Sequence, residues 1–163
     1  MTKKISKKPT SPRSPKVSGD SCTIVVSHKL VKVEENKRKA VFRNPESKEY
    51  RITKVDNCVV TEGPRTDYLV SEKGSVSVLV ELKGKDVEHA CEQLFASADH
   101  ASVRPLLESR IGFVIVCSKY PRFDTFVAKA KNTAAKRYKS GFHVICDQRE
   151  LDIIRAVAID GPY

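Results

Sequence analysis

An uninterrupted apolar stretch, residues 111 to 117 (IGFVIVC), most restricts how this chain can fold. A strand with one solvated face alternates apolar and polar side chains, whereas this stretch offers no polar face. It therefore predicts a strand that is covered on both sides by other layers. A chain of 163 residues has room for about one such core.

The segments around this strand alternate between β and helical patterns. A periodic apolar series from Val87 to Ala98, preceded by the N-cap candidate Asp86, predicts a helix packed on one side. Upstream, short β-type runs separated by polar turns predict an N-terminal antiparallel β extension. We expect an α/β sandwich with a mixed central sheet flanked by helices. The predicted strands are 22–33, 39–44, 48–55, 57–60, 67–71, 75–82, 111–118 and 142–146, and the predicted helices lie within 87–98, 119–139 and 149–158.

Positive charge is concentrated near the N-terminus. Residues 1–43 hold 12 basic and 3 acidic side chains, whereas the rest of the chain holds 18 and 17. The first 20 residues are too polar to form a core, so we expect a disordered basic arm followed by a single domain at residues 21–163. Such an arm can attract nucleic-acid phosphates, but a solubilising tail or a targeting signal explains it equally well.

A second basic cluster lies on the predicted helix within residues 119–139. It holds seven basic side chains and one acidic, a net charge of +6, and its Phe126, Val127 and Ala130 recur at helical spacing. A solvated helix surface is the alternative, yet this excess in a nearly neutral domain favours a polyanionic partner. The nucleic-acid-binding candidates are Lys119, Arg122, Lys129, Lys131, Lys136, Arg137 and Lys139.

The five cysteines are odd in number, show no CxxC spacing and mostly lie in apolar stretches. The N-terminus lacks the apolar centre of a secretory signal, and no apolar run is long enough to span a bilayer. We therefore expect an intracellular protein, in the cytoplasm or nucleoid or in a eukaryotic nucleus, with no membrane association and no disulfides. Neither zinc-ligand spacing nor a glycine-rich phosphate loop is present, which disfavours zinc and nucleotide-cofactor chemistry.

Two acidic residues are predicted to face each other across a hairpin. If residues 67–71 and 75–82 pair antiparallel around Gly74, opposed positions sum to 148, and Asp67 lies opposite Glu81 because 67 + 81 = 148. Like charges at such positions destabilise the fold unless something compensates them. A slip of one residue would turn one acid to the opposite face and remove the pair.

The simplest compensation is a divalent cation. Carboxylate and carbonyl oxygens are its preferred ligands, so the predicted ligands are Asp67, Glu81 and the backbone carbonyl of Leu82. Lys83 is two residues from Glu81 and shares its strand face. Its ammonium group could help deprotonate an attacking water and stabilise charge on a phosphate oxygen.

At these residues the chain resembles the PD-(D/E)XK nuclease superfamily, and the resemblance covers about residues 57–146. It implies the restriction endonuclease-like fold, binding of Mg²⁺ or Mn²⁺ by the two acids, and assistance of hydrolysis by the lysine. The features that carry it are Asp67 on one strand, Glu81-Leu82-Lys83 ending the next, the helix at 87–98 and the strand at 111–118.

The chain departs from the family pattern at three places. Thr66 stands where the family's proline precedes the aspartate, and Pro64 comes two residues earlier. Members often add an acid from a helix before the sheet; here the candidates are Glu62 in a nearby loop and Glu49, which by alternation faces solvent. Some members place a glutamine on the following helix, which makes Gln93 a further catalytic candidate.

These features predict a Mg²⁺-dependent endonuclease that hydrolyses phosphodiester bonds in DNA, with RNA left open as a substrate. Cutting both strands of a duplex usually requires two active sites, which a homodimer would supply. Two alternatives stay open. The chain is a non-catalytic nucleic-acid-binding module of the same fold, or its basic regions contact an acidic partner protein.

Overall fold

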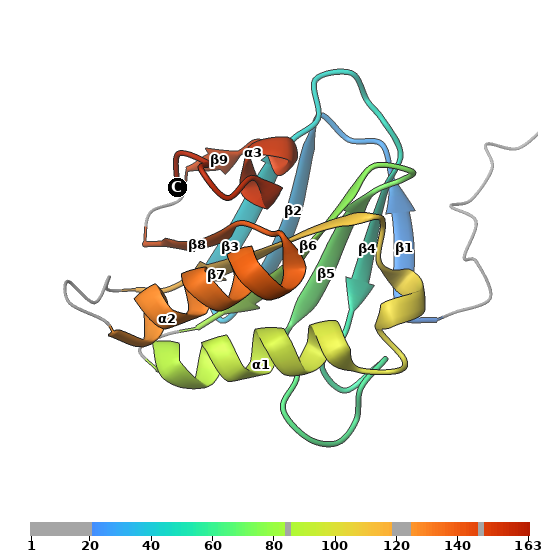
Figure 1. Cartoon of the computed structure of the whole chain (residues 1–163). Helices are drawn as coiled ribbons and strands as arrows, with labels where there is room; N and C mark the ends of the chain where they lie inside the picture. The colour runs from blue at the N-terminus through green and yellow to red at the C-terminus, as the bar shows by residue number, and fades with distance from the viewer. Residues whose placement is uncertain (1–20, 84–85, 119–124, 147–148) are drawn as a thin grey trace, which may run out of the picture.

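The computed structural model describes residues 21–83, 86–118, 125–146 and 149–163 (Figure 1). The predicted basic arm, Lys119 and Arg122 lie outside these residues. A mixed six-stranded sheet in the order β1-β4-β5-β6-β7-β8 forms the centre. Its first four strands pair antiparallel, and β6, β7 and β8 run parallel. The strands are β1 (Thr23–Val26), β4 (Tyr50–Lys54), β5 (Tyr68–Glu72), β6 (Val76–Leu82), β7 (Arg110–Val116) and β8 (Phe142–Ile145).

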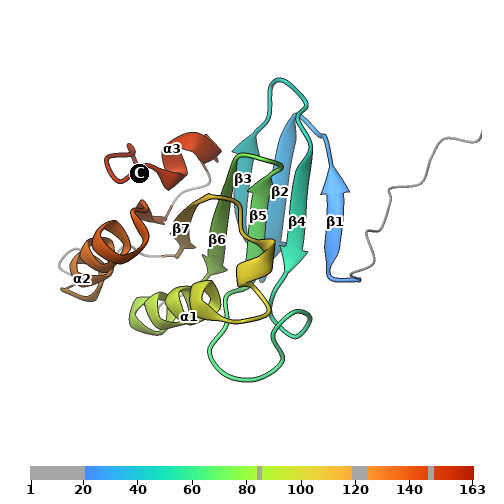
Figure 2. The same ribbon diagram turned by 45° about the vertical axis from the view of Figure 1, so that its right-hand side comes forward.

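Helical crossovers join the parallel strands. The connection from β6 to β7 runs through α1 (Val87–Asp99), and the one from β7 to β8 through α2 (Thr125–Thr133) and a π-helical turn (Ala134–Tyr138). Asp86 caps α1 as predicted, because its Oδ1 accepts the backbone N–H of His89 at 3.0 Å. Both helices lie on the same face of the central sheet (Figures 1 and 2).

A small sheet and a short helix cover the other face. Strands β2 (Leu30–Glu35) and β3 (Arg38–Arg43) pair antiparallel, and β9 (Glu150–Leu151) joins β3 in parallel. Helix α3 (Ile153–Val157) packs against β6 and β7 beside this sheet. Figure 2 shows β2 and β3 behind the central sheet, on the side away from α1.

Side-chain alternation along the central strands divides the core into two apolar clusters. Leu79 and Phe113 belong to the cluster that contains α1 and α2, whereas Val78 and Val114 belong to the cluster that contains β2, β3 and α3. The expectation that β7 is covered on both faces is confirmed. The fold is therefore an α/β arrangement with a mixed sheet flanked by helices, as predicted.

Three predicted elements differ from the structure. The run 22–33 is two strands in different sheets, because Val31 and Val33 of β2 are buried against the far face of the central sheet. The predicted strand 57–60 is reduced to an isolated bridge between Asp56 and Val60. The predicted helix at 149–158 is instead strand β9 followed by α3.

The expectation that the chain holds no disulfide is wrong for one pair. Cys22 and Cys58 are bonded, with their Cα atoms 5.7 Å apart. The β1–β4 pairing explains this contact: the N–H of Lys54 donates to the carbonyl of Cys22, and the loop after β4 carries Cys58. Cys91 and Cys117 are buried as predicted, and Cys146 is exposed. No helix among the described residues is long and apolar enough to cross a membrane.

Candidate active site

The β5–β6 hairpin has the predicted register. Tyr68 pairs with Val80 and Leu69 with Leu79, so opposed positions sum to 148. Beyond the last pair, the N–H of Asp67 donates to Oε2 of Glu81 at 3.2 Å, and the N–H of Leu82 donates to Oδ2 of Asp67 at 2.7 Å. The two acids that the sequence places opposite each other are therefore in contact.

Burial sets the protonation of this pair. Glu81 is 2% exposed, and burial raises its pKa to about 8, with the nearby charge of Asp67 adding to the shift and Lys83 opposing it. Burial also raises the pKa of Asp67 to about 6, against the stabilising N–H of Leu82. In the absence of a cation, burial therefore favours the protonated form of Glu81 more strongly than that of Asp67.

Thr66 fixes the approach of the chain to Asp67. Its hydroxyl donates to the carbonyl of Val80 at 2.7 Å, and its N–H donates to Oγ of Ser97 on α1, also at 2.7 Å. The residue is fully buried. A threonine thus ties the start of β5 to both β6 and α1, at the position where the resemblance leads one to expect proline.

Gln93 links the other side of the pair to α1. Nζ of Lys83 donates to Oε1 of Gln93 at 3.4 Å, and Nε2 of Gln93 donates to the carbonyl of Arg65 at 3.0 Å. The backbone N–H of Lys83 donates to the carbonyl of Val116 in β7 at 2.8 Å. The structure therefore brings Lys83 and Gln93 together beside the segment that leads into Asp67.

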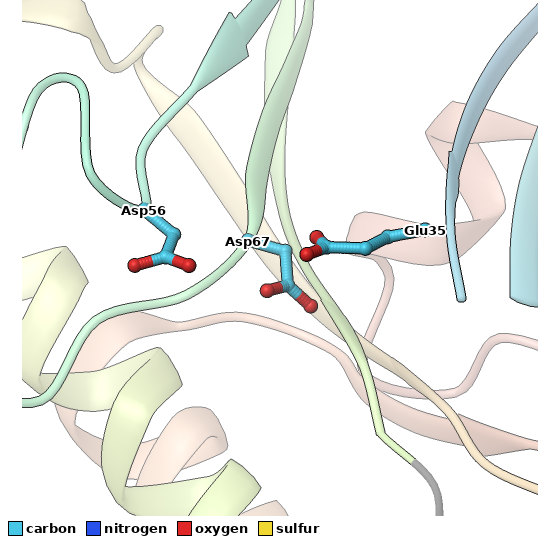
Figure 3. A group of neighbouring side chains, drawn as sticks. All are labelled: Glu35, Asp56 and Asp67. Carbon is cyan, nitrogen blue, oxygen red and sulfur yellow. The ribbon is translucent and has the colours of Figure 1, made fainter.

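A second group of carboxylates meets Asp67 from two other segments (Figure 3). Oxygens of Glu35, Asp56 and Asp67 lie within 4.8 Å of one another. Glu35 ends β2 and Asp56 follows β4, so the group joins the small sheet to the central one. Glu81 is not part of this group, and we name Glu35, Asp56 and Asp67 the acidic cluster.

Glu35 and Asp56 were not predicted from the sequence as members of the site. The predicted candidate Glu62 is exposed and is not in the acidic cluster. The other candidate, Glu49, forms an ion pair with Lys73 at 3.1 Å, and its side chain is 42% exposed. A usable signal was present: Glu35 alternates with Val31 and Val33, which places it on the buried face of β2.

Oxygen atoms from Glu35, Asp67 and the Leu82 backbone are the candidate ligands for a cation at this place. Asp56 is already paired with Arg65, but Oε2 of Glu35 is buried and has no hydrogen-bond partner in the described part of the chain. The N–H and the carbonyl of one strand residue point to the same side, so the Leu82 carbonyl faces Asp67 as its N–H does. Carboxylate and carbonyl oxygens are the ligands that Mg²⁺ and Mn²⁺ prefer.

The predicted basic surface extends away from the acidic pair. Lys129, Lys131, Lys136 and Lys139 are exposed. Arg137 is already paired with Asp99, at 2.7 Å. Helix α2 begins near the carboxyl end of β7 and runs back along the sheet, and a helix rises about 1.5 Å per residue. The cations at 136–139 therefore lie toward the opposite end of the sheet from Lys83, and Lys129 and Lys131 lie nearer to it.

Comparison of the chain with protein-family models finds no matching family, and comparisons with curated proteins and with solved structures find no match either.

Proposed function

We propose that this chain is a metal-dependent nuclease of the PD-(D/E)XK type, with a restriction endonuclease-like fold, that hydrolyses phosphodiester bonds in DNA. The observation that carries the proposal is the contact of Asp67 with Glu81 at the end of the β5–β6 hairpin, with Lys83 beside them. The order of elements supports it: the hairpin is followed by α1 and then by β7, parallel to β6. The resemblance implies this same order.

The cation would be held by Asp67, Glu81 and the Leu82 carbonyl, with Glu35 as the added acid. When bound, a divalent cation supplies positive charge that stabilises the transition state and lowers the pKa of water. Lys83 stabilises negative charge on a phosphate oxygen and assists removal of a proton from the attacking water. Gln93 positions the Lys83 ammonium group, because it holds Nζ while it is itself anchored on the carbonyl of Arg65.

Incubation of the full chain with duplex, branched and single-stranded DNA, in Mg²⁺ or in chelator, tests the proposal. We expect cleavage that requires the metal and falls by about 100-fold or more in Lys83→Ala. Lys73→Ala is the matched control, because Lys73 lies in the turn at the other end of the same hairpin and is exposed. Equal cleavage by Lys83→Ala and the wild type, in preparations free of contaminating nuclease, would contradict the mechanism.

A non-catalytic nucleic-acid-binding module is the second candidate, and the exposed lysines of α2 favour it. A gel-shift assay on the same DNA forms separates the two. Salt-sensitive binding without cutting of any form would support the binding module, and the absence of salt-sensitive binding would favour an acidic protein partner. If the chain cuts both strands of a duplex, we expect a homodimer, because each strand then needs its own active site. Analytical ultracentrifugation measures the oligomeric state directly.

A further inference from the structure

The turn between β2 and β3 brings a positive side chain next to the acidic cluster. Asn36 and Lys37 have φ values of 49° and 64°, and two central residues with positive φ are typical of a type I′ hairpin turn. The turn pairs Glu35 directly with Arg38. Paired residues project from the same face, which here is the face of the buried Val33 and Ala40.

The guanidinium group of Arg38 lacks a strong partner among the described residues. No ion pair of Arg38 with a carboxylate occurs within the described residues, although Glu35 is its cross-strand partner. Its Nη1 makes only a long contact of 3.5 Å with the carbonyl of Asn36. Its Nε is buried and lacks a hydrogen-bond partner in this part of the chain, as Oε2 of Glu35 also does. The residue as a whole is only partly buried, so the guanidinium lacks a carboxylate partner in the described residues while part of the side chain stays at the surface.

We propose that Arg38, together with Lys37 at the tip of the turn, binds a backbone phosphate of DNA beside the acidic cluster. The inference rests on the proposed nuclease function and deepens it, since it assigns the group that holds the substrate. The planar guanidinium presents paired N–H donors that match two phosphate oxygens. A phosphate there would pair with the Nη groups of Arg38, next to Glu35 of the acidic cluster.

Lys37 adds an exposed charge to the same site. It occupies the second central position of the turn, where glycine is favoured because of the positive φ. Lys39 offers a matched comparison. It is adjacent to Arg38 and carries the same charge, but alternation turns it to the opposite face of β3, where it pairs in register with Glu34.

Fluorescence anisotropy of a short labelled DNA duplex, in chelator, tests the phosphate site without any cutting. We expect Arg38→Gln to raise Kd about tenfold and to reduce the salt dependence of binding by about one ion. Arg38→Lys should recover part of the affinity, because it keeps the charge but not the fork. Lys39→Gln should change Kd less than about twofold. Thermal melting of each variant confirms that it is folded.

The outcomes separate this proposal from the nuclease proposal. If the wild type cuts DNA but Arg38→Gln binds DNA as tightly as the wild type does, the phosphate site is wrong and the nuclease function stands. If no DNA form is cut but Arg38→Gln alone weakens binding, the phosphate site stands and the nuclease function fails. Equal loss in both variants would indicate general charge attraction and would overturn the phosphate site.

Discussion

Two hairpins, β5–β6 and β2–β3, each bring a carboxylate to the candidate site, and they do so in different ways. Asp67 and Glu81 belong to a single hairpin of the central sheet and contact each other directly. Glu35 belongs to the hairpin of the small sheet and reaches Asp67 only because the two sheets pack together. Register arithmetic along the chain predicts the first contact, whereas the second depends on packing between sheets.

The charges of the two hairpins also differ. The β5–β6 hairpin brings two carboxyl groups together, and burial raises the pKa of Glu81 to about 8, with the charge of Asp67 adding to the shift. The β2–β3 hairpin pairs Glu35 with Arg38 in register, but Oε2 of Glu35 and Nε of Arg38 have no hydrogen-bond partner among the described residues. Under the proposed function, the first hairpin would hold a cation and the second would hold a phosphate beside it.

The largest expected effect is on the cleavage rate, and it distinguishes Asp67 of the central sheet from an exposed acid. Asp67→Asn should lower cleavage by about 1000-fold or more, because Asp67 is the one carboxylate that lies both beside Glu81 and in the acidic cluster. Glu62→Gln, in the exposed loop before it, should change the rate less than about twofold. Initial rates on the preferred DNA form give both numbers, and a comparable loss in both variants would contradict the assignment of Asp67.

A smaller effect is expected for the acid of the other hairpin. Glu35→Gln should weaken the binding of Mn²⁺ by about tenfold, as the loss of one outlying ligand of a metal site does. Titration calorimetry with Mn²⁺ alone measures this without substrate. Glu34→Gln is the matched control, since Glu34 is the preceding residue and its side chain is 48% exposed. Unchanged Mn²⁺ affinity in Glu35→Gln would restrict the cation site to the β5–β6 hairpin.

The pH dependence of stability tests the raised pKa values of Asp67 and Glu81. Asp67 and Glu81 have folded pKa values of about 6 and 8, both above the ordinary values of 3.8 and 4.5. The fold therefore favours their protonated forms, and this contribution is complete below about pH 4 and is lost as pH rises through 6 and 8. In chelator, the free energy of unfolding should fall across this window by on the order of 1 kcal/mol per pH unit.

Two comparisons isolate that effect. Glu81→Gln should flatten the decline between pH 6 and 8, because a neutral amide replaces the group that titrates there. Excess Mg²⁺ should also reduce the decline in the wild type, because a cation favours the ionised carboxylates. Urea denaturation at several pH values measures both. If the free energy of unfolding falls with pH at the same slope in the wild type and in Glu81→Gln, burial does not raise the pKa of Glu81.

Sequence patterns were sufficient for features that depend on neighbours along the chain. The apolar run at 111–117, the cap at Asp86 and the hairpin around Gly74 all depend on local spacing, and each is confirmed. The contact between Asp67 and Glu81 follows from the same spacing. Its burial was not predicted: in the structure Glu81 continues a strand whose residues are all buried.

Sequence patterns did not predict contacts between segments that are far apart along the chain. A continuous β-type run from 22 to 33 does not reveal that β1 and β2 belong to different sheets. For the same reason the role of Glu35 was missed, since it depends on which sheet face β2 covers. The Cys22–Cys58 bond likewise depends on the pairing of β1 with β4, which brings together residues 36 positions apart.

The smallest expected effect concerns Lys37. Lys37→Gly should raise the free energy of unfolding by up to about 1 kcal/mol, because glycine adopts the positive φ of 64° without the strain of a side chain. The same substitution should weaken DNA binding, since it removes a cation from the tip of the turn. A lysine kept only for structure would give the opposite pattern: lower stability and unchanged binding. Urea denaturation and fluorescence anisotropy on this one variant therefore show whether Lys37 lowers the stability of the β2–β3 turn while it increases the affinity for DNA.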